Sequence, residues 1–148
     1  GFEVCGCEEK NPYSSEIGKL ASAYASAEVP LITLVTGAAY GSVFSVLGSK
    51  SIGADIVFAL EDAKISCLNA KSAVALLWND KISADVSREA LEEKWNETVA
   101  NPFEAAKAGE VDDIIEKGEV RQRLASAVMM LSSKNAEIPY RRHANMPL

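Results

Sequence analysis

The chain has 148 residues, of which 48% are hydrophobic and 24% charged, a composition typical of a single globular domain. It carries 15 Lys and Arg against 21 Asp and Glu, a formal net charge of −6. Such an acidic chain lacks the basic footprint that nucleic-acid binding requires, and its apolar stretches are far shorter than the roughly 20 residues that span a bilayer. We therefore expect one domain over residues 1–148, with a polar tail over 132–148, and neither a nucleic-acid partner nor a membrane span.

The three cysteines, Cys5, Cys7 and Cys67, are too few for a disulfide framework in a domain of this length. With His143 as the single histidine they also make a poor zinc set, because structural zinc normally has four ligands in paired spacings. We expect reduced thiols, a cytoplasmic location and no metal. The chain opens on Gly1 without a polar leader, and we expect it to cover only part of a fold.

Helices alternate with short apolar strands along the chain. Apolar residues at helical spacing, preceded by the capping residues Ser14 and Ser15, predict a first helix over 16–27. Short β-branched or apolar runs predict strands over 31–36, 55–60, 64–67 and 111–115. Further helices are expected over 41–48, 70–78, 87–99, 103–108 and 118–131, the last with an apolar stripe of Val120, Leu124, Ala127, Val128 and Leu131. This alternation predicts an α/β fold.

The side chains offer little obvious chemistry, since the sequence has no Ser-His-Asp arrangement, no P-loop and no GxGxxG motif. Asp112 and Asp113 are adjacent on a predicted strand and would face opposite ways, so we do not expect an acid/base pair there. The main basic group fits either an ion-pair network on a solvated face or a site for a phosphate-bearing ligand; it consists of Arg121, Arg123, Arg141 and Arg142.

The segment from Thr36 to Phe44 is the most informative one. A predicted strand ends there, the chain turns through small residues, and a predicted helix begins. Unpaired N–H groups at the start of a helix stabilise an anion, and small residues let a ligand oxygen approach them. Such an oxyanion site needs no catalytic side chain. Tight packing of a helix on a strand explains the same small residues, so spacing alone leaves both interpretations open.

A series of motifs resembles one known family. In order, the motifs are Gly1-Phe2-x-x-Cys5-Gly6, Val29-Pro30-Leu31-Ile32-Thr33, Ala39-Tyr40-Gly41, Gly48-Ser49-Lys50, Gly53-Ala54-Asp55-Ile56-Val57-Phe58-Ala59, Val111-Asp112-Asp113-Ile114-Ile115, Met130-Leu131-Ser132-Ser133-Lys134 and His143-Ala144-Asn145-Met146-Pro147-Leu148. The series resembles the C-terminal half of the carboxyltransferase domain of biotin-dependent acyl-CoA carboxylases and decarboxylases. Members of that family include propionyl-CoA carboxylase β-chains and the α subunits of methylmalonyl-CoA and glutaconyl-CoA decarboxylases.

The resemblance implies a crotonase-like fold, a spiral of β-β-α units, over essentially the whole chain. It implies a carboxyltransferase subunit or half-subunit that moves CO2 between carboxybiotin on a partner carrier domain and a coenzyme A thioester, in the carboxylase or the decarboxylase direction. In the family the N-terminal half carries the acyl-CoA site and the C-terminal half faces carboxybiotin. We therefore expect three kinds of partner: an N-terminal carboxyltransferase half or second subunit, a biotin carrier protein, and further copies in a homo- or hetero-oligomer.

The resemblance also assigns the site residues. The backbone N–H groups of Ser42 and Val43, preceded by Gly41, would form an oxyanion hole for the ureido oxygen of biotin, and Gly6 belongs to the same cofactor-binding group. Ser45 stands where the family lines its acyl pocket and where side-chain size helps to choose the acyl group. The complete substrate-binding set carried over in this way is Tyr40, Ser45, Leu68, Asn69 and Ala70.

The chain departs from the family at glycines near this site. Ser42 and Val43 stand where the family has Gly and Ala, and Asn69 and Ser72 stand where it has two further glycines. A Cβ at the turn narrows access to the amides and disfavours a positive φ. Two other interpretations therefore stay open: a catalytically silent structural subunit that completes the oligomer, and a biotin-independent crotonase-type protein that binds acyl-CoA.

Overall fold

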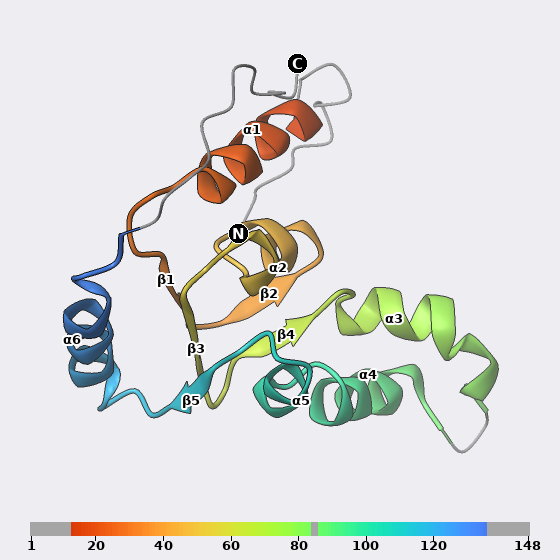
Figure 1. Cartoon of the computed structure of the whole chain (residues 1–148). Helices are drawn as coiled ribbons and strands as arrows, with labels where there is room; N and C mark the ends of the chain where they lie inside the picture. The colour runs from red at the N-terminus through yellow and green to blue at the C-terminus, as the bar shows by residue number, and fades with distance from the viewer. Residues whose placement is uncertain (1–12, 84–85, 136–148) are drawn as a thin grey trace.

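The computed structural model describes residues 13–83 and 86–135 (Figure 1). Gly6, which the resemblance places in the cofactor-binding group, lies outside these ranges, and so does the chain beyond residue 135 with Arg141, Arg142 and His143. The strands are β1 Ile32–Val35, β2 Ala38–Tyr40, β3 Ile56–Leu60, β4 Lys64–Ser66 and β5 Asp113–Ile115. The helices are α1 Tyr13–Ala25, α2 Ser42–Val46, α3 Ala70–Leu77, α4 Arg88–Thr98, α5 Pro102–Lys107 and α6 Val120–Leu131, with short 3-10 turns η2 Lys50–Ile52 and η3 Asn79–Lys81.

The strands form two small parallel sheets. One has the order β1-β3-β5, with Ile32 opposite Ile56 and Phe58 opposite Asp113, and the other pairs β2 with β4. Two successive units, β1-β2-α2 and β3-β4-α3, each give their first strand to the first sheet and their second strand to the second. The predicted α/β class and the predicted β-β-α organisation are both confirmed.

Strand β3 lies at the centre of the fold and is buried on both faces, as parallel strands usually are. Because side chains alternate along a strand, Val57 and Ala59 pack toward β4 and α5, together with Ile65 and Ala105. The intervening residues Phe58 and Leu60 pack on the opposite face of the sheet with Ile115, Ala127 and the half-buried side of α6. Figure 1 shows α6 and α5 on the two sides of this sheet.

Helices α3 and α4 lie side by side as a hairpin beyond the second sheet (Figure 1). Trp95 is buried and meets Trp78 edge to face, with ring centroids 5.1 Å apart. Both helices begin at a side-chain cap, since Asn69 Oδ1 accepts the N–H of Ser72 and Ser87 Oγ accepts that of Ala90. Leu91 and Trp95, one helical turn apart in the helix expected over 87–99, are both buried.

Three details differ from the sequence-based expectation. The sequence predicts a turn at residues 38–40, because three small or aromatic residues carry no periodic signal. The structure has strand β2 there, and this strand is formed by its pairing with β4. Helix α1 begins at Tyr13, so Ser14 and Ser15 lie inside it rather than capping it. Val128, expected on the apolar stripe of α6, is 58% exposed, because Ala127 and Leu124 face the sheet instead. No helix in the described ranges is long and apolar enough to cross a membrane.

Candidate functional site

Gly41 forms the turn between β2 and α2, the place that the sequence singled out. Its backbone has φ 56° and ψ −125°, a region that glycine enters easily and other L-residues rarely do. A Cβ placed on Gly41 would meet the carbonyl oxygen of Cys67 at 3.7 Å, an ordinary contact. The backbone conformation, and not a lack of space, therefore requires glycine here.

The amides that follow Gly41 are free of backbone partners within the described ranges. Gly41 N donates to the Ser66 carbonyl at 3.4 Å, and Ser45 N donates to the Gly41 carbonyl at 3.0 Å. No backbone hydrogen bond in residues 13–83 and 86–135 uses the N–H of Ser42 or Val43, as is usual for the first N–H groups of a helix. Two adjacent donors are thus available to an acceptor outside this part of the chain.

The side chains at Ser42 and Val43 do not strain the turn. Among the described residues only glycines have a positive φ, so both side chains stand on ordinary helical backbone. The Ser42 side chain is exposed, while Val43 is half-buried and faces an adjoining cavity. The loss of glycine at these two positions therefore leaves the backbone path of the turn intact.

The predicted substrate-binding residues come from two segments that the structure brings together. Tyr40 pairs with Ser66 across the second sheet, which places the Gly41 turn beside the chain that leads into α3. Tyr40 and Leu68 pack against a cluster containing Ala70 and Trp95, and burial raises the pKa of the Tyr40 phenol.

The remaining predicted positions have individual surroundings. Ala70 is buried in that cluster, whereas Asn69 is exposed and holds the start of α3 with its side chain. Ser45 is exposed on α2, and its hydroxyl donates to the Gly41 carbonyl at 3.1 Å. Ser45 is therefore joined directly to the turn.

A cavity of about 320 Å³ adjoins the turn. Its walls are mainly apolar and come from β1, β2, β4, α2 and the segment before β5; they include Val35, Val43, Phe44, Leu47, Ile65 and Val111. Glu110 also lines it, and the Oε2 atom of Glu110 is buried without a hydrogen-bond partner in the described part of the chain. Sequence reasoning missed Glu110, because a glutamate after a turn glycine gives no signal of burial.

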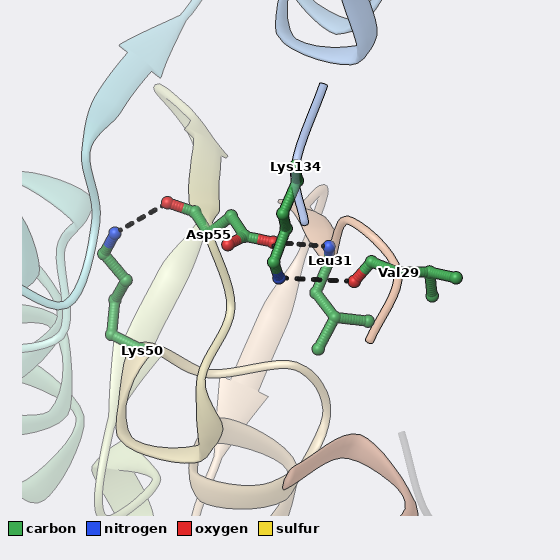
Figure 2. Close-up of polar contacts among 5 residues, drawn as sticks. All are labelled: Val29, Leu31, Lys50, Asp55 and Lys134. Carbon is green, nitrogen blue, oxygen red and sulfur yellow. Dashed lines mark hydrogen bonds and ion pairs between the residues drawn. The ribbon is translucent and has the colours of Figure 1, made fainter. Parts of the chain in front are cut away.

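Two other motif residues, Lys50 and Asp112, hold segments of the fold together. Lys50 Nζ lies 2.8 Å from Asp112 Oδ2, and it donates to the Asp55 carbonyl at 3.0 Å (Figure 2). The same Asp112 oxygen accepts the N–H of Val57 at 2.8 Å. Lys50 thereby joins η2 to the chain entering β3 and β5.

The two adjacent aspartates have different ion-pair partners. Asp112 faces Lys50, whereas Asp113 faces Arg123 at 3.6 Å, so the expectation that they separate is confirmed. Arg123 also lies 3.6 Å from Glu119, and both contacts favour the ion-pair interpretation of this arginine. In residues 13–83 and 86–135, no group of three or more His, Cys, Asp or Glu is placed to hold a metal ion.

Comparisons with known proteins give consistent matches. A family model described as the carboxyl transferase domain matches residues 1–146. The chain is 40% identical over 152 aligned residues to the carboxyltransferase subunit of propionyl-CoA carboxylase from Haloferax mediterranei, with 100% of the chain and 30% of that protein covered. It is 38% identical over 135 residues to the α subunit of methylmalonyl-CoA decarboxylase from Propionigenium modestum, with 88% of the chain and 26% of that protein covered.

A solved structure extends this likeness to the fold. Transcarboxylase 12S, crystallised as a hexamer with hydrolysed methylmalonyl-coenzyme A bound, matches with a TM-score of 0.90 and 30% identity, over 100% of this chain and 29% of that one. The crotonase-like carboxyltransferase fold expected from the motifs is confirmed. The chain spans about 30% of the length of the relatives it matches.

Proposed function

The chain belongs to the carboxyl transferase domain family, and on this premise we propose that it supplies the carboxybiotin-facing part of an acyl-CoA carboxyltransferase. The reaction moves a carboxyl group between carboxybiotin, carried on a partner domain, and a coenzyme A thioester. Either direction, carboxylation or decarboxylation, fits the proposal, since relatives of both kinds match the chain.

One observation carries the proposal: the N–H groups of Ser42 and Val43 are adjacent and have no backbone partner within the described ranges. Carboxybiotin, when bound, would supply CO2 and leave negative charge on its ureido oxygen. Backbone donors held by the fold stabilise such charge without reorganising during the reaction. The pair of amides fits this oxygen, and its availability favours an active site over the alternative of a silent structural subunit.

We assign the surrounding residues to substrate. Tyr40 and Leu68 would form the apolar wall beside the turn, with Asn69 exposed at its edge. The exposed Ser45 is proposed to meet the acyl group, as the family resemblance implies. Ala70 completes the proposed substrate set, limited to backbone contacts because its side chain is buried. Gly6 stays a proposed member of the cofactor-binding group, together with Gly41, Ser42 and Val43.

The proposal requires partners, because the chain spans only about 30% of its relatives' length. We propose that the acyl-CoA site comes from an N-terminal carboxyltransferase half or second subunit, and that a biotin carrier protein delivers carboxybiotin to a homo- or hetero-oligomer. Large apolar side chains exposed on α3, α5 and α6 support such an assembly; they are Leu76, Leu77, Phe103, Val128, Met129 and Met130. A cytoplasmic location stays a prediction.

The Ser42→Pro variant tests the proposal in the assembled carboxyltransferase that contains this chain. Proline removes the N–H and is tolerated at the first position of a helix. Loss of one oxyanion donor lowers kcat by about a hundredfold or more, so transfer of labelled carboxyl to acyl-CoA should fall to that extent. Ser42→Gly, which keeps the N–H, is the matched control and should retain activity. Full turnover by a folded Ser42→Pro assembly would contradict the proposal.

A further inference from the structure

We propose that the open edges of β1 and β2 are a docking surface for a β-β unit of the N-terminal carboxyltransferase half, whose two strands continue both sheets in parallel and whose side chains fill the cavity beside α2. The inference rests on the proposed function, which requires that half as a partner. It deepens the proposal, because it names the surface and the kind of segment through which the two parts join.

The order of the elements gives the place of the added strands. Each first strand lies beside the first strand of the next unit, since β1 pairs with β3 and β3 with β5, and the second strands β2 and β4 follow the same rule. Helix α1 precedes β1 as α2 precedes β3, but no strand precedes α1 within residues 13–83. A unit that ends in α1 would place its strands beside β1 and β2. The chain spans about 30% of its relatives' length, so the rest of the carboxyltransferase can supply that unit.

The backbone of β1 faces both ways. The Leu31 carbonyl accepts the N–H groups of Asp55 and Ile56 at 2.9 and 3.3 Å, so the peptide groups at this residue face β3. Because the direction of these groups alternates along a strand, Ile32 and Leu34 present their N–H and C=O groups to the opposite edge. A row of such groups is a template for a further strand.

Strand β2 has the same arrangement. The carbonyl of Gly37 and the N–H of Gly41 bond to β4 at 3.0 and 3.4 Å, so by alternation the groups of Ala38 and Tyr40 face away from β4. On the other side of the fold, helix α5 packs against both β4 and β5. This cover favours the side of β1 and β2 as the place where strands are added.

The cavity beside α2 reaches this edge. Residues 33–39, the end of β1 and the start of β2, line it without a break, whereas none of the β3 residues 56–60 does. Successive side chains of a strand point to opposite faces, so a space that touches every residue in turn lies along an edge. Since β3 occupies the other edge of β1, the cavity is at the open one. Its mainly apolar walls fit apolar side chains of a docked strand.

Glu110 adds a polar requirement to the cavity. Its Oε2 atom is buried and has no hydrogen-bond partner in the described ranges, and Glu110 lines the same space. Buried acceptors are nearly always paired, because leaving one without a donor is costly. The docked unit therefore brings one hydrogen-bond donor for Glu110 among its apolar side chains.

Amide hydrogen exchange in the assembled carboxyltransferase tests the docking surface. The outward amides of Ile32, Leu34, Ala38 and Tyr40 should exchange about a hundredfold more slowly than unstructured amides, as the inward amide of Thr33 should. Exchange at the unstructured rate at these four positions would overturn the proposal. Equal protection in this chain alone would overturn it too, by assigning the edges to a segment of the chain when dilute or to a second copy when concentrated.

The Ala38→Pro variant tests β2 by affinity. Ala38 is exposed, and proline removes its outward N–H while sparing the bonds to β4, as edge strands allow. With the N-terminal half as a separate polypeptide, the Kd of the two parts should rise about tenfold. Ala38→Ser keeps the N–H and is the matched control, with a Kd within about twofold of the wild type. An unchanged Kd in Ala38→Pro would contradict strand addition at β2.

Substitutions at Glu110 test for the donor. Glu110→Leu would leave that donor unpaired, so the Kd should rise about tenfold, whereas Glu110→Gln keeps an acceptor oxygen and should stay within about threefold. Without a donor, leucine would only add apolar contact, so an unchanged or lower Kd would overturn this role of Glu110. Carboxyl transfer separates the two proposals. Unprotected edges in an active wild-type assembly would overturn the docking surface alone, and full turnover by Ser42→Pro with protected edges would overturn the proposed function alone.

Discussion

The ammonium of Lys134 lies 2.8 Å from Oδ2 of Asp55, across 79 residues of sequence (Figure 2). The same Asp55 oxygen accepts the N–H of Leu31 at 2.8 Å, and Lys134 also donates to the Val29 carbonyl at 3.3 Å. Both charged side chains are only 21% exposed, so this pair is shielded from the solvent that weakens surface ion pairs. It ties the segment after α6 to the chain entering β1 and β3.

The Asp55 pair predicts how stability depends on pH. Burial alone would raise the Asp55 pKa, but the hydrogen bonds from Lys134 and Leu31 and the charges of Lys134 and Lys50 lower it below the ordinary 3.8. A carboxylate whose pKa is lowered by folding contributes its full stabilisation at pH values well above the pKa that it has in the unfolded chain. That stabilisation is lost as the pH falls through 3.8 toward the lower folded value. Thermal unfolding of Asp55→Asn should show a lower Tm at pH 7 and a smaller further drop in acid.

Asp62→Asn is the control for this experiment. Asp62 also pairs with a lysine, Lys117, at 2.7 Å, but the two side chains are 59% and 72% exposed. Exposed pairs of this kind contribute little to stability, so Tm should change by about a degree or less. Equal Tm losses in the two variants would show that shielding of the Asp55 pair has no effect.

We expect substitution by alanine to change the free energy of unfolding differently at Gly41 and at Gly37. Gly41→Ala places a Cβ on backbone with φ 56°, and such a conformation costs a non-glycine residue on the order of 1–3 kcal/mol. Gly37 has no positive φ and no atom within 4 Å of an added Cβ, so Gly37→Ala should be neutral or slightly stabilising. Urea denaturation of both variants measures the difference, and equal free energies of unfolding would refute the strain argument.

Much of the fold could be predicted from the sequence because its elements carry strong local signals. The β-branched and apolar run of β3 and the helical spacing of apolar residues in α6 each act over a few residues. β2 could not be predicted in this way, since its register with β4 is a tertiary property. The partnerless Oε2 atom of Glu110 likewise depends on how distant segments meet around the cavity.

The candidate site was predicted from motifs and not from periodicity. Helix spacing left the small residues around Gly41 open to two interpretations, and the resemblance selected the oxyanion site. The structure adds two details that no sequence pattern contained. The N–H groups of Ser42 and Val43 have no backbone partner in residues 13–83 and 86–135, and Ser45 donates two hydrogen bonds to the Gly41 carbonyl. The hydrogen bond from the Ser45 hydroxyl to the Gly41 carbonyl could not be predicted, because a serine on a short helix has many equivalent partners before the backbone path is known.

Ile115 should be among the most sensitive core positions. Its side chain is 0% exposed at the end of β5, between the central strand β3 and helix α6. Ile115→Ala should lower the free energy of unfolding by about 2–5 kcal/mol, because the substitution loses apolar burial and leaves a cavity, whereas Ile115→Val should cost about 0.5–1.5 kcal/mol. Urea denaturation checks both values, and similar small losses in the two variants would show that this part of the core relaxes to fill the space.

The exposed methionines of α6 should contribute to an interface. Met129 and Met130 are 76% and 66% exposed and lie next to Val128, an apolar group that soluble monomers rarely leave uncovered. In sedimentation at high micromolar concentration, the isolated chain should associate, and the double variant Met129→Ser with Met130→Ser should shift toward the monomer. Gln122→Ser, at an exposed polar position of the same helix, should leave the association unchanged. A wild-type chain that sediments as a non-associating monomer would contradict this prediction, because its apolar surface would then be stable in water without a partner.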